Sequence, residues 1–142
     1  MNKTIIKAKE LIKQGETLRA LSLLEKHSPE KSISQLTSLY ALCIARERGQ
    51  VRKAIELCHR AINKEPDETI HYYCLGRIHL LDKNRKEAIQ VFREGLKHGT
   101  DQDIIAELES LGIRKDPPFK FLKRSNPLNK YTGLLLKIFG LR

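Results

Sequence analysis

An alanine that recurs every 34 residues constrains the fold more than any other feature of this sequence. Ala20, Ala54 and Ala88 are each followed by an aliphatic residue, and each is preceded by a turn-like phrase: KQGETLRA, ERGQVRKA or DKNRKEA. Self-similarity at a period of this length is typical of repeat proteins, in which each unit buries its apolar surface against the next one. The sequence therefore predicts an array of three similar units.

The segments on both sides of each turn phrase carry apolar residues at three- and four-residue steps, which predicts helices. β-branched residues do not alternate with polar ones over any useful length, so strands are not expected. The fold class is therefore all-α, with three helix–turn–helix units at about residues 1–34, 35–68 and 69–100. Gly15 and Gly49 suit a turn residue with positive φ, and Asn84 is expected to take that conformation in the third unit.

A further helix is expected at residues 101–112, with Thr100 or Asp101 as its N-cap and Gly112 at its end. Its apolar residues would cap the last unit, because the end of such an array leaves an apolar flank. Residues 1–113 then form the body of the protein. Residues 114–142 form a basic extension that contains two adjacent prolines, with an amphipathic helix predicted at 127–141.

The repeat resembles the tetratricopeptide repeat (TPR). The third unit carries the clearest signature, YYCLGRIH followed by Ala88 and Phe92, and the first unit is degenerate. The second unit matches the pattern at Leu42, Ala45, Ala54, Ala61 and Pro66. This resemblance implies a right-handed α-α superhelix. The layout is similar to that of small bacterial stand-alone TPR proteins with a basic C-terminal extension, a group that brings no assigned activity.

The resemblance also implies that the first helix of each unit lines a concave face that binds a protein or peptide. The matching candidate residues are Lys9, Lys13, Tyr40, Arg46, Tyr73 and Arg77. Such a mixed surface suits an acidic, amphipathic segment. The alternative is that some of these side chains only pack between neighbouring helices. The set of Lys, Asn and Arg residues by which chaperone-binding members hold a C-terminal carboxylate is not present, so an adaptor of that type is not expected.

The sequence predicts no catalytic residues, no cofactor and no metal site. His71, Cys74 and His79 lie close in sequence, but a zinc site needs further ligands from a facing helix. No glycine-rich phosphate loop is present. The odd number of cysteines and the charged N-terminal segment favour reduced thiols in the cytoplasm, with a position at the inner membrane face as a further possibility.

The C-terminal extension carries most of the net charge of +10, with eight Lys/Arg against one Asp/Glu in residues 114–142. Its predicted helix is too short to span a bilayer. Three roles remain open for its apolar arc: folding back on the body, binding a partner or a second copy, and lying in a membrane interface. The contact residues expected there are Leu134, Leu135, Ile138 and Phe139.

These observations predict a non-catalytic scaffold or adaptor that binds a protein or peptide. One alternative is a peripheral membrane protein held by its basic tail, and another is a secretion-type chaperone, since that group also uses three such repeats. Nucleic-acid binding is not expected, because aromatic residues make up only 6% of the chain and Trp is absent.

Overall fold

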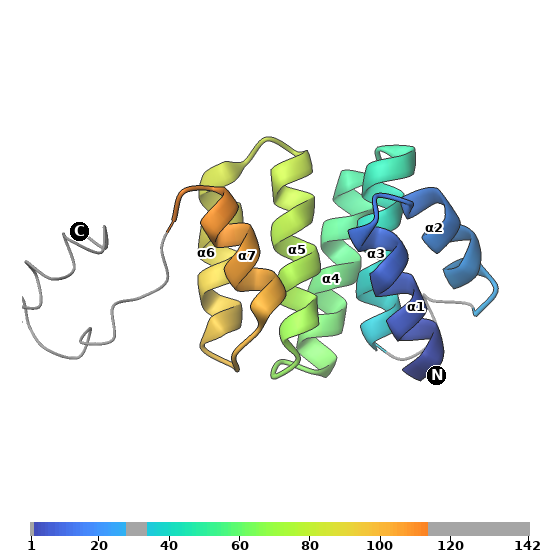
Figure 1. The fold of residues 1–142 in the computed structure, drawn as a ribbon, viewed down its shortest axis with the longest axis horizontal. Helices are drawn as coiled ribbons and strands as arrows, with labels where there is room; N and C mark the ends of the chain where they lie inside the picture. The colour runs from blue at the N-terminus through green and yellow to red at the C-terminus, as the bar shows by residue number, and fades with distance from the viewer. Residues whose placement is uncertain (1, 28–33, 114–142) are drawn as a thin grey trace, which may run out of the picture. The chain divides into compact units, whose positions relative to one another are not determined.

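A computed structural model describes residues 2–27 and 34–113, and all regular secondary structure in these residues is α-helical (Figure 1). The prediction of an all-α fold is therefore confirmed. The seven helices of the described residues are α1 (Asn2–Lys13), α2 (Thr17–Glu25), α3 (Ser34–Arg48), α4 (Val51–Lys64), α5 (Thr69–Leu81), α6 (Arg85–Leu96) and α7 (Gln102–Ser110). The helix predicted at residues 127–141 lies outside the described residues.

Two compact units divide the chain, Met1–Ile104 and Ile105–Arg142. In the first unit, successive helices pack as pairs: α1 with α2, α3 with α4, and α5 with α6. The pairs also pack on one another, because α3 contacts α2 and α5, and α4 contacts α5. Each pair is joined by a short turn, as the 34-residue period predicted.

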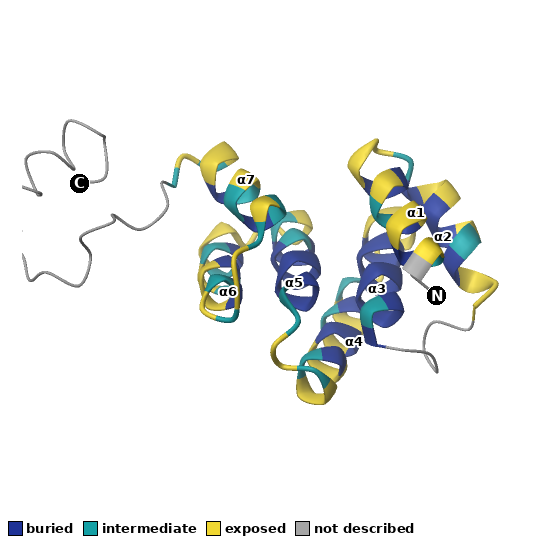
Figure 2. Cartoon of the chain, turned by 60° about the horizontal axis from the view of Figure 1, so that its bottom comes forward, coloured by how far each residue is buried: buried dark blue, intermediate teal, exposed yellow. Residues whose placement is uncertain are grey.

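Helices α3 and α5 lie at the centre of the first unit and are buried along most of their length (Figure 2). Since each is packed on several sides, neither has the broad polar face of a surface helix. The outer helix α4 buries only one stripe, which consists of Ala54, Leu57, Cys58 and Ala61.

Small residues allow the paired helices to approach closely. Ala20, Ala54 and Ala88 are all 0% exposed. In the third pair, a Cβ atom added to Gly76 of α5 would lie 2.2 Å from Cε1 of Phe92 on α6. The aromatic ring therefore occupies the space that a side chain at position 76 would need.

The turns end the first helix of each pair with a left-handed residue. Gly15 and Gly49 have φ of 82° and 67°, as predicted. In the third turn the left-handed residue is Lys83, with φ of 60°, and Asn84 has φ of −105°, so the prediction for Asn84 was wrong. Asn84 is instead the N-cap of α6, where its side chain accepts a hydrogen bond from the Glu87 N–H at 3.3 Å.

The hydrogen bonds around Lys83 explain this difference. The Lys83 N–H donates to the Leu80 carbonyl at 3.0 Å, and the Asn84 N–H donates to the His79 carbonyl at 2.8 Å. This pair of bonds forms a Schellman motif, which requires the left-handed residue at the first position after the helix cap. The position is therefore set by where α5 ends, whichever residue stands there.

Helix α7 begins and ends as the sequence predicted. Oδ1 of Asp101 accepts hydrogen bonds from the N–H groups of Asp103 and Ile104, at 2.9 and 3.2 Å. At the other end Gly112 has φ of 80°, and the Ile113 N–H donates to the Leu108 carbonyl at 2.8 Å. Within residues 2–27 and 34–113, no helix is long and apolar enough to cross a membrane.

Candidate binding site around Asp103

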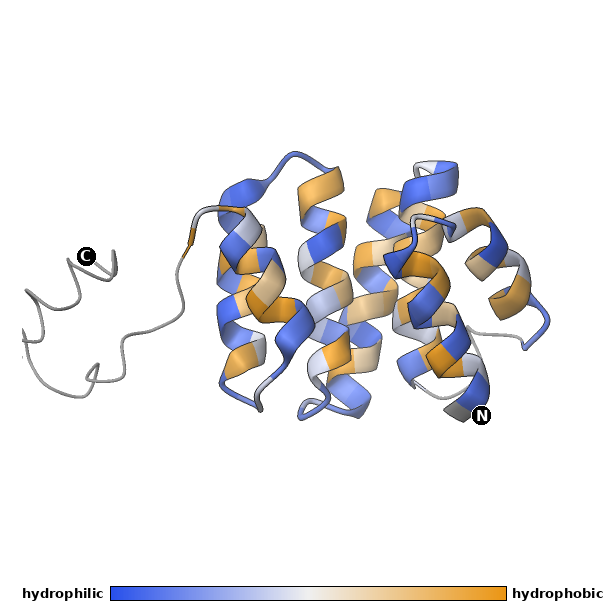
Figure 3. Cartoon of the chain, in the orientation of Figure 1, coloured by the Kyte–Doolittle hydropathy of each residue, from blue (hydrophilic) through white to orange (hydrophobic). Residues whose placement is uncertain are grey.

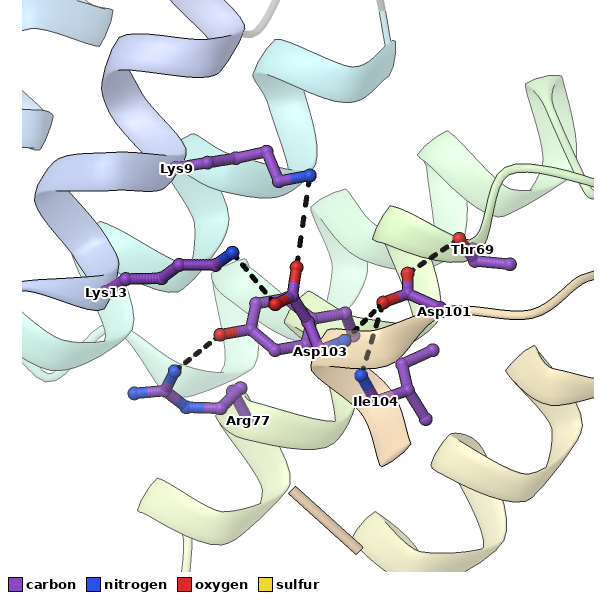
Figure 4. Close-up of polar contacts among 8 residues, drawn as sticks. Lys9, Lys13, Thr69, Arg77, Asp101, Asp103 and Ile104 are labelled. Carbon is purple, nitrogen blue, oxygen red and sulfur yellow. Dashed lines mark hydrogen bonds and ion pairs between the residues drawn. The ribbon is translucent and has the colours of Figure 1, made fainter. Parts of the chain in front are cut away.

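Two lysines of α1 meet a carboxylate at the start of α7 (Figure 4). Lys9 and Lys13 are four residues apart and so lie on one face of α1. The Lys13 Nζ is 2.8 Å from Oδ1 of Asp103, and the Lys9 Nζ is 4.0 Å from Oδ2. The contact joins side chains from the first and the last helix of the described chain.

The backbone around Asp103 is held in place by the N-cap of α7. The Thr69 hydroxyl, at the start of α5, donates a hydrogen bond of 2.7 Å to Oδ2 of Asp101, whose other oxygen caps α7. Asp103 lies in the first turn of the helix, where the helix dipole favours a negative charge. Its carboxylate is therefore presented from a defined position toward α1.

An aromatic residue and an arginine of α5 form the second part of the site. The Arg77 Nη1 donates a hydrogen bond of 2.8 Å to the Tyr73 hydroxyl, and the guanidinium carbon lies 5.7 Å from the centroid of the Tyr73 ring. Tyr73 is 5% exposed, and Arg77 is half-buried. The arginine head group is therefore oriented by its own helix, which lowers the entropy lost when it binds an anion.

The buried thiol of Cys74 is influenced by cations of both parts. Burial raises its pKa well above the ordinary value, and the neighbouring thiols of Cys58 and Cys43 raise it further. The positive charges of Arg77 and Lys9 act in the opposite direction on the same pKa. Cations from α5 and α1 thus both lie near the Cys74 thiol.

The cysteines themselves are buried, free and protonated. Burial is the main reason that the pKa of Cys43 is raised to about 12, and burial also raises the pKa of Cys58. A thiol must lose its proton to act as a nucleophile or a metal ligand, so these residues behave as small hydrophobic side chains. No group of three or more His, Cys, Asp or Glu in the described residues is placed to hold a metal ion.

Of the six candidates on the predicted concave face, Lys9, Lys13, Tyr73 and Arg77 belong to the two parts described above. Tyr40 is buried, at 7% exposed, and lies within reach of Arg48, whose pKa is raised mainly by the hydrogen bond that Arg48 donates to Glu25 and also by Tyr40. Arg46 is exposed and partly offsets the rise in the Cys43 pKa. The predicted tail contacts, Leu134, Leu135, Ile138 and Phe139, lie outside the described residues.

Asp103 is the residue that the sequence reasoning missed. The apolar residues of the capping helix predict its packing, and nothing near Asp103 in the sequence points to lysines on α1. The period contains the one available signal, because Asp103 lies 34 residues after Thr69, the first residue of α5. Asp103 therefore lies in the first turn of a further helix in the series α1, α3, α5.

The arrangement can hold an anion, since two lysines and an oriented arginine from different helices lie around one carboxylate and one aromatic ring. No model of a protein family matches this chain, and no curated protein or solved structure is significantly similar to it.

Proposed function

We propose that this protein is a non-catalytic scaffold or adaptor that binds an acidic segment of another protein at the surface formed by Lys9, Lys13, Tyr73 and Arg77. The observation that carries the proposal is the contact between Lys13 and Asp103, in which this surface already accepts a carboxylate. A glutamate or aspartate of a partner would take the place of Asp103.

The proposed architecture is a short TPR-like superhelix. It is supported by the three packed helix pairs, by the buried alanine in each pair, and by the left-handed residue at each turn. In such an array α1, α3 and α5 would line the concave face, which would put the lysines of α1 and the Tyr73–Arg77 pair on one binding surface. The proposed compartment is the cytoplasm, a location supported by the three free cysteines.

Lys9 and Lys13 are accessible to a partner, and their ion pair with Asp103 is weak enough to be exchanged. The side chains of Lys9 and Lys13 are 37% and 52% exposed, and that of Asp103 is 26% exposed. An ion pair this accessible contributes only about 0–1 kcal/mol to folding, so it can be exchanged for a partner's carboxylate at little cost. The proposed complex should weaken as salt is added, because exposed charges are screened.

The test is affinity capture from an extract of the native cell, followed by measurement of the dissociation constant with the purified partner. Lys13→Glu should weaken binding by about tenfold, because it places a negative charge against an acidic segment. Lys86→Glu makes the same change of charge on the exposed surface of α6 and should leave the affinity unchanged. Asp103→Asn removes the internal competitor and should tighten binding a few-fold.

Thermal unfolding of each variant checks that the fold is intact. A partner that binds the Lys13→Glu protein as tightly as the wild type would show that this surface is not the site. If neither the wild type nor the Asp103→Asn protein captures a specific partner, the binding function itself is wrong.

A further inference from the structure

A second surface with binding character lies on the first helix pair. A pocket of about 240 Å³ opens between α1 and α2, and it is lined by Lys7, Leu11, Arg19, Ser22, Leu23 and Lys26. Leu11 is buried and Leu23 is half-buried, so the apolar part of the pocket is formed by these two residues. Leu18 lies one helical turn from Ser22 and is 65% exposed.

This surface is separate from the site around Asp103. Lys7 and Leu11 are four residues apart and share one face of α1, as Lys9 and Lys13 share another. A step of two residues turns a helix by about 200°, so the two faces point in nearly opposite directions. Figure 3 shows hydrophobic and hydrophilic residues on both α1 and α2, and neither helix is polar all round.

The size and charge of the pocket indicate what it can accept. Its volume is below the roughly 300–1,000 Å³ of small-molecule sites, and it is better matched to an apolar side chain of a partner. Three cations, Lys7, Arg19 and Lys26, lie around the two leucines. Arg19 also contacts Glu16 at 2.8 Å, but this exposed pair is weak enough to exchange.

We propose that the pocket between α1 and α2 docks an amphipathic helix of another protein, with a leucine-like residue in the pocket and acidic residues against Lys7, Arg19 and Lys26. We favour this occupant because its acidic residues would complement the three cations around the pocket. In a dimer formed through this surface, Lys7, Arg19 and Lys26 of one copy would repel the same residues of the other copy. Residues 114–142 of this chain carry eight Lys/Arg against one Asp/Glu, so they would also bring positive charge. With the proposed Asp103 site, the protein would hold two partner segments on opposite faces of α1.

The test measures fluorescence anisotropy of a labelled synthetic peptide added to the full-length protein. The peptide has about 15 residues, so that a helix can form on binding, with leucines at i, i+3, i+4 and i+7 and glutamates elsewhere. One control peptide replaces glutamate by lysine, and another replaces leucine by alanine. The acidic leucine peptide should bind the wild type at least tenfold more tightly than either control.

Variants locate the bound peptide. Ser22→Trp fills the pocket, and Lys7→Glu combined with Lys26→Glu reverses its charge, so each should weaken binding about tenfold or more. Lys86→Glu tests an unrelated exposed lysine and should bind as the wild type does. Lys13→Glu reports peptide held at the Asp103 site and should weaken binding less than either pocket variant. Circular dichroism checks the fold of each variant. We expect the fold to be retained, because the side chains of Ser22, Lys7 and Lys26 are exposed.

Three results would overturn the inference. The first is that the peptide does not bind, or that its affinity is unchanged by both pocket variants. The second is that Lys13→Glu weakens binding as much as they do, which would place the peptide on the other surface. The third is evidence that something else occupies the pocket. A wild-type dimer that dissociates in the Ser22→Trp variant, measured by sedimentation, would indicate a second copy. Methyl NMR signals of Leu134 and Leu135 that shift in the Ser22→Trp variant would indicate the C-terminal extension. The Asp103 proposal is tested by capture of its own partner, and the second result would favour it, so the two proposals fail separately.

Discussion

The Ser38 hydroxyl on α3 lies 2.6 Å from Nδ1 of His71 on α5, and both residues are 0% exposed. The other ring nitrogen, Nε2, is 3.4 Å from Oε1 of Glu65, without hydrogen-bond geometry. Burial lowers the pKa of His71 below its usual value of 6.5, although Glu65 and Glu68 act to raise it. A neutral imidazole therefore joins the second and third helix pairs.

This histidine predicts a stability that falls in mild acid. Because the folded state has a lower His71 pKa than the unfolded state, its contribution is fully present above pH 6.5 and is lost as the pH falls toward the folded-state pKa. The loss is at most about 1.4 kcal/mol per pH unit. Urea unfolding at several values between pH 7.5 and pH 5 should show a smaller decrease for His71→Gln than for the wild type.

Other groups that titrate in this range are common to both proteins and cancel in the difference. They include His79, whose pKa is also lowered by burial. His27→Gln changes an exposed histidine just after α2 and serves as the control. If His71→Gln loses stability with falling pH as steeply as the wild type, the buried ring does not control this dependence.

Gly76→Ala should destabilise the protein by about 2 kcal/mol or more. The added methyl group would lie 2.2 Å from a ring atom of Phe92, a fully buried side chain that has little room to move. Gly99→Ala is the matched control, because its Cβ would be 3.6 Å from the nearest atom, the Thr69 Cγ2. Equal free energies of unfolding for the two variants would contradict the tight packing of α5 on α6.

Lys83→Gly should stabilise the protein by about 0.5–1 kcal/mol. Lys83 has φ of 60°, a conformation that costs a residue with a side chain roughly 1 kcal/mol or more. Glycine avoids this cost, although it gains entropy in the unfolded chain. Chemical denaturation measures the change.

Gly49→Ala is the reciprocal test at the corresponding position of the second turn. It should destabilise by about 1 kcal/mol, since Gly49 has φ of 67° and its Cβ would meet nothing within 4 Å. The effect would therefore come from the backbone alone. Opposite signs for the two substitutions are expected, and the same sign for both would rule out the shared turn conformation.

Asp101→Ala should destabilise α7 by about 1–2 kcal/mol, because two backbone N–H groups lose their acceptor and Thr69 loses its carboxylate partner. Hydrogen exchange of the Asp103 and Ile104 amides should accelerate. Asp101→Asn keeps one acceptor oxygen and should recover much of the loss. Unchanged amide protection in Asp101→Ala would mean that the cap does not hold the start of α7.

The helices and their ends were largely predictable because their causes are local. Apolar spacing identified the helix pairs, and Gly15, Gly49 and Gly112 marked three helix ends correctly. The exception, Asn84, shows the limit of residue preference. Asparagine suits both a left-handed turn and an N-cap, and the choice was made by the length of α5, which places Lys83 at the left-handed position.

The candidate site was predictable only in part. Lys9 and Lys13 are paired by helical spacing, and so are Tyr73 and Arg77, so each pair could be found from the sequence. The ion pair between these lysines and Asp103 could not be predicted, because a contact between distant segments depends on where complete helices lie in space. Packing buries both tyrosines of the predicted surface, with Tyr40 at 7% and Tyr73 at 5% exposed, and it leaves Tyr40 near Arg48.

The sequence by itself determined that this chain forms paired helices with a 34-residue period, since helical periodicity and turn residues act within a few positions along the chain. Tertiary structure decided which side chains meet: Ser38 with His71, Gly76 with Phe92, and Lys13 with Asp103. Such contacts arise from the close packing of helices far apart in sequence, and that packing determines both the burial of a histidine and the carboxylate that faces a lysine.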